Sequence, residues 1–480
     1  MRAARLLVLA GLLALGAAPA PWDAAPWRAD LAQMRAAIDE KYANHDWLTR
    51  ERGVDLDQLF ARADTALSKA ADEASAQRAF DRLVARIADG HVSISWPVAA
   101  VAVSAKPPAA ATPAALCQSL GYDARRAGRG FVHKLPGYRP VEGAMFPAGI
   151  VTSGGQRVGV VRIGVFEPAG YPTLCEAAVA SLKIDPAAPC DEACDNAVVS
   201  FGYARITEEF EAALRRVRAA GATVVMLDIA NNGGGSEWAE AAARMLTRQR
   251  LVSARRGFVR GPHWARQWAA LAERFRGYAA EAGPADRTRL LGWAAQADAA
   301  RALAETPCRT RGCDRIGRVG YATGLVGAAR AGEYLDKPWG AYVFSAGQHD
   351  YHDGVWDGPL IVLINQETWS AAEEVAAMLQ DNRAAVILGE RSGGAGCGHT
   401  YGGTPTTLSN SGAVLDLPDC VRFRADGSNE VAGVIPDVLT GMRANDGDAT
   451  AARLTSARLP EAVARAVVQY RARHQTRRRG

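Results

Sequence analysis

The sequence lacks the motifs of several common binding sites. Its glycine-rich turns contain neither GxxxxGKS nor GxGxxG, so nucleotide binding has little support. None of its eight cysteines has the paired CxxC spacing of a zinc site. The sequence also has little excess of positive over negative charge. Its formal net charge is +5, and it falls to +3 without Arg2 and Arg5. This balance argues against nucleic acid as a partner, and no metal or organic cofactor is implied.

The N-terminus carries a targeting pattern. Residues 1–20, MRAARLLVLAGLLALGAAPA, place two arginines before an apolar run that ends in small residues. This arrangement is typical of a secretory signal peptide rather than a membrane span. Cleavage between Ala17 and Ala20 would leave a mature chain without a membrane span. We therefore expect a secreted or periplasmic protein.

All eight cysteines lie beyond this segment, and their even number suits disulfide formation in an oxidising compartment. Local spacing suggests three pairs and leaves a fourth by subtraction: Cys190 with Cys194, Cys308 with Cys313, Cys397 with Cys420, and Cys117 with Cys175.

Composition divides the chain into five parts. Residues 21–98 carry helix formers at helical spacing and end in the strand-like HVSISW, and residues 99–156 form a linker or variable segment rich in Pro and Ala. Strands and helices alternate over residues 157–440, which predicts an α/β fold with a mixed or parallel sheet. A helical insertion or lid without strand signals interrupts this core at about residues 250–350. Residues 441–480 predict a terminal helix and a basic tail.

Ser370 stands where an apolar strand, residues 360–364, runs into a segment of helix formers, residues 371–379. A second apolar run at 385–388 completes a strand, helix, strand unit. Ser370 then lies at the carboxyl end of the first strand, where open α/β sheets place their chemistry and helix N-termini favour negative charge. A serine there can be a nucleophile, but SAAE at 370–373 is also a capping box that merely starts a helix.

Three other segments carry candidate groups. A buried strand ending at Ile229 runs into glycines 233–235, which can expose N–H groups to an oxyanion or simply allow a sharp turn. His91 opens a strand in DGHVSISW, although most histidines have no chemistry. Glu430 lies in the polar turn of NEVAGVIPDV, where glutamates are usually solvated.

Four motifs occur in a characteristic order: DGH, then DxxxNGGG, then TxSAAE with a downstream GE and glycine-rich loop, then ExxGVxPD. Together they resemble the tail-specific or C-terminal processing peptidase family, whose core is a crotonase-like β/α fold. The resemblance covers roughly residues 80–98 and 157–440, apart from the insertion. It implies a serine-type peptidase that hydrolyses peptide bonds of a polypeptide substrate, with a helical N-terminal region added to the core.

The sequence departs from the processing proteases at one decisive position. Ala395 stands in the glycine-rich loop where those enzymes carry a lysine as general base, so a Ser-Lys dyad is excluded there. No PDZ module is evident between the DGH segment and the core. The chain is therefore most similar to the tricorn-like branch, although Gly90 replaces a serine of tricorn and Ala230 replaces a common arginine of the DxRxN motif.

The tricorn-like resemblance implies a role for each motif. His91 is the general base, Ser370 is the nucleophile, and Glu430 orients a supporting polar network. The N–H groups of Gly234 and Ala371 form the oxyanion hole.

The sequence leaves alternatives open for the identity of the general base and for the function of the protein. His399, on the loop just past the missing lysine, is the competing base. A non-catalytic crotonase-like protein that binds a ligand or peptide is one alternative function. An esterase-like serine hydrolase is another, although Ser370 lacks the GxSxG context of many esterases.

Overall fold

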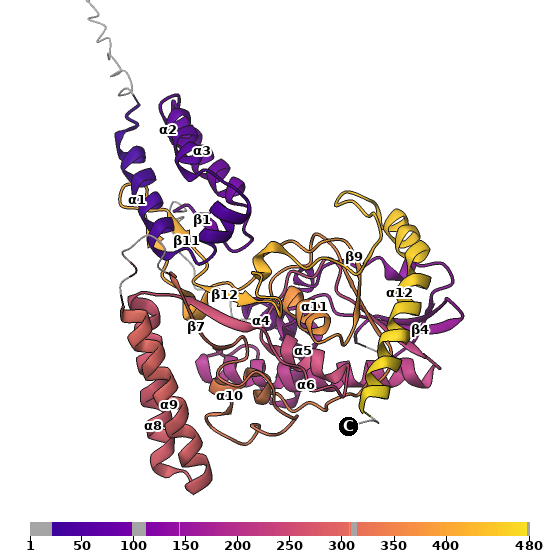
Figure 1. The fold of residues 1–480 in the computed structure, drawn as a ribbon. Coiled ribbons are helices and arrows are strands. Elements are labelled where there is room, and N and C mark those ends of the chain that lie inside the picture. The colour runs from indigo at the N-terminus through magenta and orange to yellow at the C-terminus, as the bar shows by residue number, and fades with distance from the viewer. Residues whose placement is uncertain (1–21, 98–111, 144, 307, 309–313, 478–480) are drawn as a thin grey trace, which may run out of the picture.

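The computed structural model describes most of the chain (Figure 1). The described residues are 22–97, 112–143, 145–306, 308 and 314–477. The expected signal peptide, residues 1–20, lies outside them, as does Cys313 of one expected cysteine pair. Among the helices in these ranges, none has the length and apolar character needed to cross a membrane.

A seven-stranded mixed sheet forms the centre of the molecule, in the order β13-β9-β8-β5-β4-β3-β2. Neighbouring strands from β4 to β13 run parallel, whereas β2 and β3 add an antiparallel edge. The strands are β2 (Arg139–Pro140), β3 (Ala148–Ser153), β4 (Gln156–Arg162), β5 (Val224–Asp228), β8 (Leu360–Ile364), β9 (Val386–Gly389) and β13 (Val438–Leu439). The α/β class expected from the alternating pattern is confirmed.

Helices cover both faces of this sheet, which explains why β5 and β8 are apolar throughout. On one face, Val225 and Leu227 of β5 share a core with α6 (Glu192–Ala219), α7 (Trp238–Met245) and α11 (Ala371–Asp381). On the other face, Val224 and Met226 pack with α12 (Asp448–Arg477), the yellow helix of Figure 1. The strand containing residues 360–364 therefore delivers Ser370 from the middle of a layered core.

The N-terminal region is helical, and a second core joins it to a late segment of the chain. It comprises α1 (Ala25–Lys41), a π-helical turn (Trp47–Glu51), α2 (Leu56–Leu67) and α3 (Glu73–Ile87). After α3, β1 (Ser93–Ser95) pairs with β11 (Val414–Asp416), which also pairs with β10 (Thr406–Thr407). Leu408, Leu415 and Val431 pack among the N-terminal helices. This packing brings the chain around His91 to the sheet core.

The expected helical insertion differs from the structure, because it also contains strands. A hairpin of α8 (Pro262–Glu281) and α9 (Pro284–Glu305) projects from the molecule (Figure 1). The strands β6 (Arg255–Val259) and β7 (Ile316–Tyr321) flank it and form a small sheet with β12 (Cys420–Phe423). Arginine and glycine interrupt the apolar pattern of RRGFV and IGRVGY, which hid both strands from the sequence analysis.

The expected linker is likewise partly structured. Residues 98–111 lie outside the description, but α4 (Pro113–Ser119) and the edge strands β2 and β3 fall within 99–156. The remaining regular elements are α5 (Pro172–Ser181), α10 (Gly340–Val343) and the 3-10 helices Ala124–Arg126, Val132–Lys134, Pro168–Gly170, Ser345–Gln348, Thr400–Gly402 and Glu430–Ala432.

Within the described residues, the structure has three disulfides. The bonded pairs are Cys190 with Cys194 and Cys397 with Cys420, as local spacing predicted, and Cys117 with Cys175, as expected by subtraction. The bond between Cys397 and Cys420 ties the glycine-rich loop after β9 to β12. Such bonds are consistent with an extracytoplasmic protein.

Candidate active site

Ser370 begins α11 with a strained backbone. Its φ of 55° and ψ of −118° are not the extended values of an ordinary helix cap. Non-glycine residues persist in such conformations only where the surrounding structure imposes them, and they cluster at active sites. The surroundings do impose it here, because Trp369 N–H donates to Asn232 O at 2.9 Å in the turn before the helix. A simple helix cap therefore does not explain this serine.

Glu373 fastens the start of α11 to the glycine-rich loop. Its buried carboxylate accepts hydrogen bonds from the N–H groups of Ser370 at 3.0 Å, Gly394 at 2.7 Å and Ala395 at 2.8 Å. These hydrogen bonds tie the first residue of the helix and the loop to one side chain. The sequence analysis treated this glutamate only as half of a capping box, although SAAE was the signal that could have identified it.

Asp89 holds the turn that carries His91. Its carboxylate accepts hydrogen bonds from His91 N–H at 3.0 Å, Tyr42 Oη at 2.9 Å and Asn44 Nδ2 at 2.8 Å. Burial raises the pKa of Asp89 to about 6, against the lowering effect of these donors. The aspartate of the DGH motif thus fixes the backbone from which the imidazole projects.

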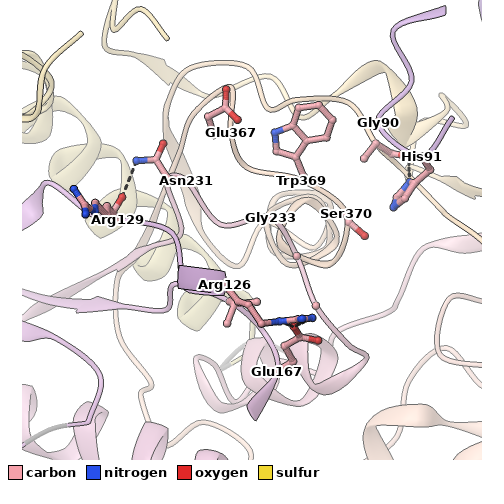
Figure 2. A pocket seen from close by; sticks show the side chains of 14 residues that line it. Gly90, His91, Arg126, Arg129, Glu167, Asn231, Gly233, Glu367, Trp369 and Ser370 are labelled. Carbon is pink, nitrogen blue, oxygen red and sulfur yellow. Dashed lines mark hydrogen bonds and ion pairs between the residues drawn. The ribbon is translucent and has the colours of Figure 1, made fainter. Parts of the chain in front are cut away.

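The His91 ring is oriented for accepting a proton. Its Nδ1 lies 2.8 Å from Ala395 O, and a carbonyl oxygen only accepts, so Nδ1 carries the hydrogen and Nε2 has the lone pair. Burial lowers the pKa of His91 to about 4, which keeps the ring neutral near pH 7. Figure 2 shows the Ser370 hydroxyl pointing toward the side of the cavity where His91 lies. The two predicted residues are thus brought together from distant segments.

His399 lies beside His91, but its ring forms a hydrogen bond with a different group. Its Nε2 is 3.0 Å from the backbone oxygen of His91, so this nitrogen donates a hydrogen bond that supports the DGH turn. The two ring centroids are 6.0 Å apart. His399 therefore contacts the backbone of the candidate base, within a second cavity that Ser370 also lines.

Glu430 is buried and reaches Ser370 through an arginine. Arg422 donates to Glu430 Oε1 from Nε at 2.9 Å, and its Nη2 donates to Ser370 O at 3.0 Å and Gly396 O at 2.8 Å. Its Nη1 also pairs with Glu374 at 3.1 Å. Burial raises the pKa of Glu430, and the charge of Arg422 opposes this shift. The sequence analysis missed Arg422, whose only signal was a lone arginine within the short apolar strand CVRF.

The glycine loop after β5 differs from the expectation. The Gly234 N–H donates to Asn232 Oδ1 at 2.8 Å, so it is engaged within its own loop rather than offered to a ligand. Its Cα faces Ser370, since an added Cβ would lie 2.8 Å from Ser370 Cβ and 3.0 Å from Ala371 N. Within the part of the chain that the structure describes, the N–H groups of Gly235 and Ala371 have no hydrogen-bond acceptor.

A cavity of about 910 Å³ opens in front of Ser370 (Figure 2). Trp369 forms one wall, and its indole packs directly against two glycines, Gly90 and Gly393. An added Cβ would come within 2.2 Å of the ring at Gly90 and 2.6 Å at Gly393. The opposite side carries an ion pair in which Arg126 Nε donates to Glu167 Oε1 at 2.8 Å. In the described ranges, no group of three or more potential metal ligands was found.

Comparison with known proteins identifies the family. The model of peptidase family S41 matches residues 197–440, just over half of the 480 residues. A search of curated proteins returned no match. The crystal structure of mature CPAF has a TM-score of 0.56 and 16% identity, over 92% of this chain and 97% of that one. Its complex with lactacystin gives the same TM-score and identity, over 92% and 98%.

A putative peptidase from Parabacteroides merdae has a TM-score of 0.47 and 12% identity, over 92% of this chain and 96% of that one. The two CPAF structures show that the fold is shared, a β/α core with added helical regions. The chain belongs to peptidase family S41 and is a serine-type peptidase.

Proposed function

We propose that the protein is an endopeptidase in which Ser370 is the nucleophile and His91 is the general base. The observation that carries this proposal is the His91 Nδ1 contact with Ala395 O, which leaves Nε2 to accept a proton in the cavity of Ser370. As Ser370 Oγ attacks the peptide carbonyl carbon, Nε2 takes its proton and then gives it to the leaving amine. A water molecule repeats the sequence on the acyl-enzyme and releases the second product.

The same loop supports a tricorn-like mechanism without a lysine. At the position where processing proteases carry that lysine, Ala395 contributes its carbonyl oxygen, and His91 uses it to fix the tautomer. Glu430 does not touch the imidazole. We assign it a positioning role, because it holds the Arg422 guanidinium that in turn holds the carbonyl oxygens of Ser370 and Gly396.

We assign the oxyanion hole to Ala371 N–H together with an N–H of the glycine loop. Gly235 offers an N–H without an acceptor, whereas Gly234 contributes the close approach to Ser370. Donors of this kind stabilise the negative charge that develops on the carbonyl oxygen, each by roughly 3 to 4 kcal/mol.

The Gly234→Ala variant is expected to lose about a hundredfold or more in kcat, on the scale of a lost oxyanion donor. Its new Cβ would press on Ser370 Cβ and Ala371 N, and the φ of +105° is unfavourable for alanine. Gly233→Ala is the matched control, since an added Cβ there meets nothing within 4 Å. Steady-state peptide hydrolysis and the Tm of both variants provide the test. Equal losses in the two variants would contradict the assigned role of Gly234.

The pH dependence of kcat/KM should reflect the buried state of His91. Because burial lowers its pKa from 6.5 to about 4, the neutral base persists at lower pH than for an exposed histidine. We expect the acid limb that reports His91 to lie near pH 4, below any loss of activity near pH 6 that protonation of Asp89 causes. Asp89→Asn is the control, because protonation of Asp89, with a pKa of about 6, would also disturb the turn. An acid limb near pH 6.5 that persists in this variant would exclude a buried His91 as the base.

We also propose that the protein acts outside the cytoplasm, in the periplasm or after secretion. The pattern of residues 1–20 and the three disulfides support this location.

Turnover of an unfolded polypeptide, compared with a matched series of small esters, tests the proposed function. We expect cleavage of internal peptide bonds. Turnover of esters alone would favour an esterase-like hydrolase, and turnover of neither would favour a protein that only binds its ligand.

A further inference from the structure

The second cavity beside Ser370 has a volume of about 480 Å³ and extends toward the small sheet of β6 and β12. His91, Ser370 and Arg256 of β6 are among the residues that line it. We refer to it as the Arg256 cavity. Its position next to the nucleophile makes it a place where one part of a bound polypeptide would lie, and this inference rests on the proposed function.

Two arginines face each other across the small sheet. β6 and β12 are antiparallel, and Arg256 lies directly opposite Arg422, so their side chains project on the same face. Like charges in directly opposed positions destabilise a sheet unless other charges compensate them. Arg422 is compensated by Glu430 at 2.6 Å and Glu374 at 3.1 Å. Among the described residues, no carboxylate forms an ion pair with Arg256.

The side chain of Arg256 is half-buried, and its guanidinium lies against two tryptophan rings. Its central carbon lies 5.4 Å from the ring centroids of both Trp264 and Trp268. Its Nε is buried and has no hydrogen-bond partner in the described structure. Burial lowers the pKa of Arg256 from its ordinary value, yet an arginine of this kind stays charged at neutral pH. A partly desolvated cation without an anionic partner is costly, and a bound anion would reduce that cost.

The acidic groups in and near the cavity do not supply this anion. Glu374 lines the cavity but pairs with Arg422 at 3.1 Å. Asp419 accepts from Thr400 N–H at 2.9 Å and pairs with His263 at 3.0 Å. Glu237 lines the cavity but is exposed to solvent. Ser345 adds a further unsatisfied group, because its Oγ is buried in the cavity wall and has no hydrogen-bond partner among the described residues.

We propose that the Arg256 cavity is a substrate subsite that binds a carboxylate of the polypeptide, on one side of the scissile bond. The guanidinium presents a planar fork of N–H donors that matches a carboxylate, and the two tryptophans hold this fork in place. The carboxylate belongs either to an acidic side chain or to the C-terminus of the substrate. The protein is thus a peptidase with a preference for acidic groups near the cleavage point.

Matched peptides test this subsite. One series places Glu or Gln at each position around the scissile bond, and a second series ends in a free acid or an amide. We expect the acid member to be cleaved about tenfold more efficiently in kcat/KM at one position or at the terminus. The series in which the ratio appears identifies the source of the carboxylate.

Variants of Arg256 test whether this residue causes the difference in kcat/KM between the acid and amide peptides. Arg256→Met should bring the acid-to-amide ratio close to one, and Arg256→Lys should retain part of the preference because it keeps the charge. Arg255→Met is the matched control, because Arg255 is the exposed neighbour on the same strand. Its guanidinium carbon lies 4.4 Å from the Tyr321 ring centroid. Its loss should leave the acid-to-amide ratio of kcat/KM unchanged. A wild-type ratio near one in both series, or a preference that survives Arg256→Met, would overturn the proposal.

Binding separates this inference from the proposed function. If no peptide is hydrolysed, the proposed function fails, and the affinities of the same peptides for Ser370→Ala still decide the subsite. Tighter binding of the acid peptide to Ser370→Ala, lost in Ser370→Ala/Arg256→Met, supports carboxylate recognition. Equal affinities for the acid and amide members contradict it.

Discussion

Ser370→Ala should reduce peptide hydrolysis by on the order of 10⁴- to 10⁶-fold, because it removes the atom that attacks the carbonyl carbon. The residual rate would come from binding and oxyanion stabilisation alone. The fold should survive, since the structural bonds at this position come from the backbone. Its N–H donates to Glu373, and its carbonyl oxygen accepts from Arg422. Alanine has the same Cβ as serine, so the strained φ of 55° adds little further cost.

Steady-state kinetics on one peptide substrate, together with the Tm of both proteins, provide the measurement for this variant. We expect the Tm to stay close to that of the wild type while kcat/KM collapses. Full activity in Ser370→Ala would remove this residue from the mechanism.

His91→Ala should lower kcat by on the order of 10⁴- to 10⁶-fold, close to the effect of losing the nucleophile, because serine and its base act as a unit. His399→Ala is the informative comparison, since the two rings lie 6.0 Å apart. The hydrogen bond from His399 Nε2 to His91 O supports the turn, and its loss should cost about tenfold or less.

The measurement is kcat of both histidine variants with the same peptide substrate. Circular dichroism checks that both proteins fold. Retained activity in His91→Ala with a large loss in His399→Ala would transfer the role of general base to His399.

The local sequence pattern was sufficient to predict the strands and the helix around Ser370. The apolar run of β8, the helix formers of α11 and the apolar run of β9 each carried a clear period, and the structure has them at residues 360–364, 371–381 and 386–389. By contrast, β6 and β7 carry arginine and glycine among few apolar residues. Their pairing with β12 depends on tertiary contacts that no local period records.

The site required contacts between remote segments. The hydrogen bond from His91 to Ala395 O spans 304 residues, and the one from Arg422 to Ser370 O spans 52. The order of the motifs pointed to His91 and Glu430, but it could not show that an arginine joins Glu430 to Ser370. The sequence analysis also did not foresee that the Gly234 N–H donates to the side chain of Asn232, because an Asn side chain competes for backbone N–H groups two residues on.

The attachment site of a fluorophosphonate probe tests the pairing of Ser370 with His91 most directly. Peptide mass spectrometry of the labelled protein would locate the adduct, with His91→Ala and His399→Ala treated in parallel. We predict that Ser370 carries the label in the wild type and in His399→Ala, and that His91→Ala is labelled far more slowly. A label on another residue, or equally fast labelling of Ser370 in His91→Ala, would contradict the proposed mechanism.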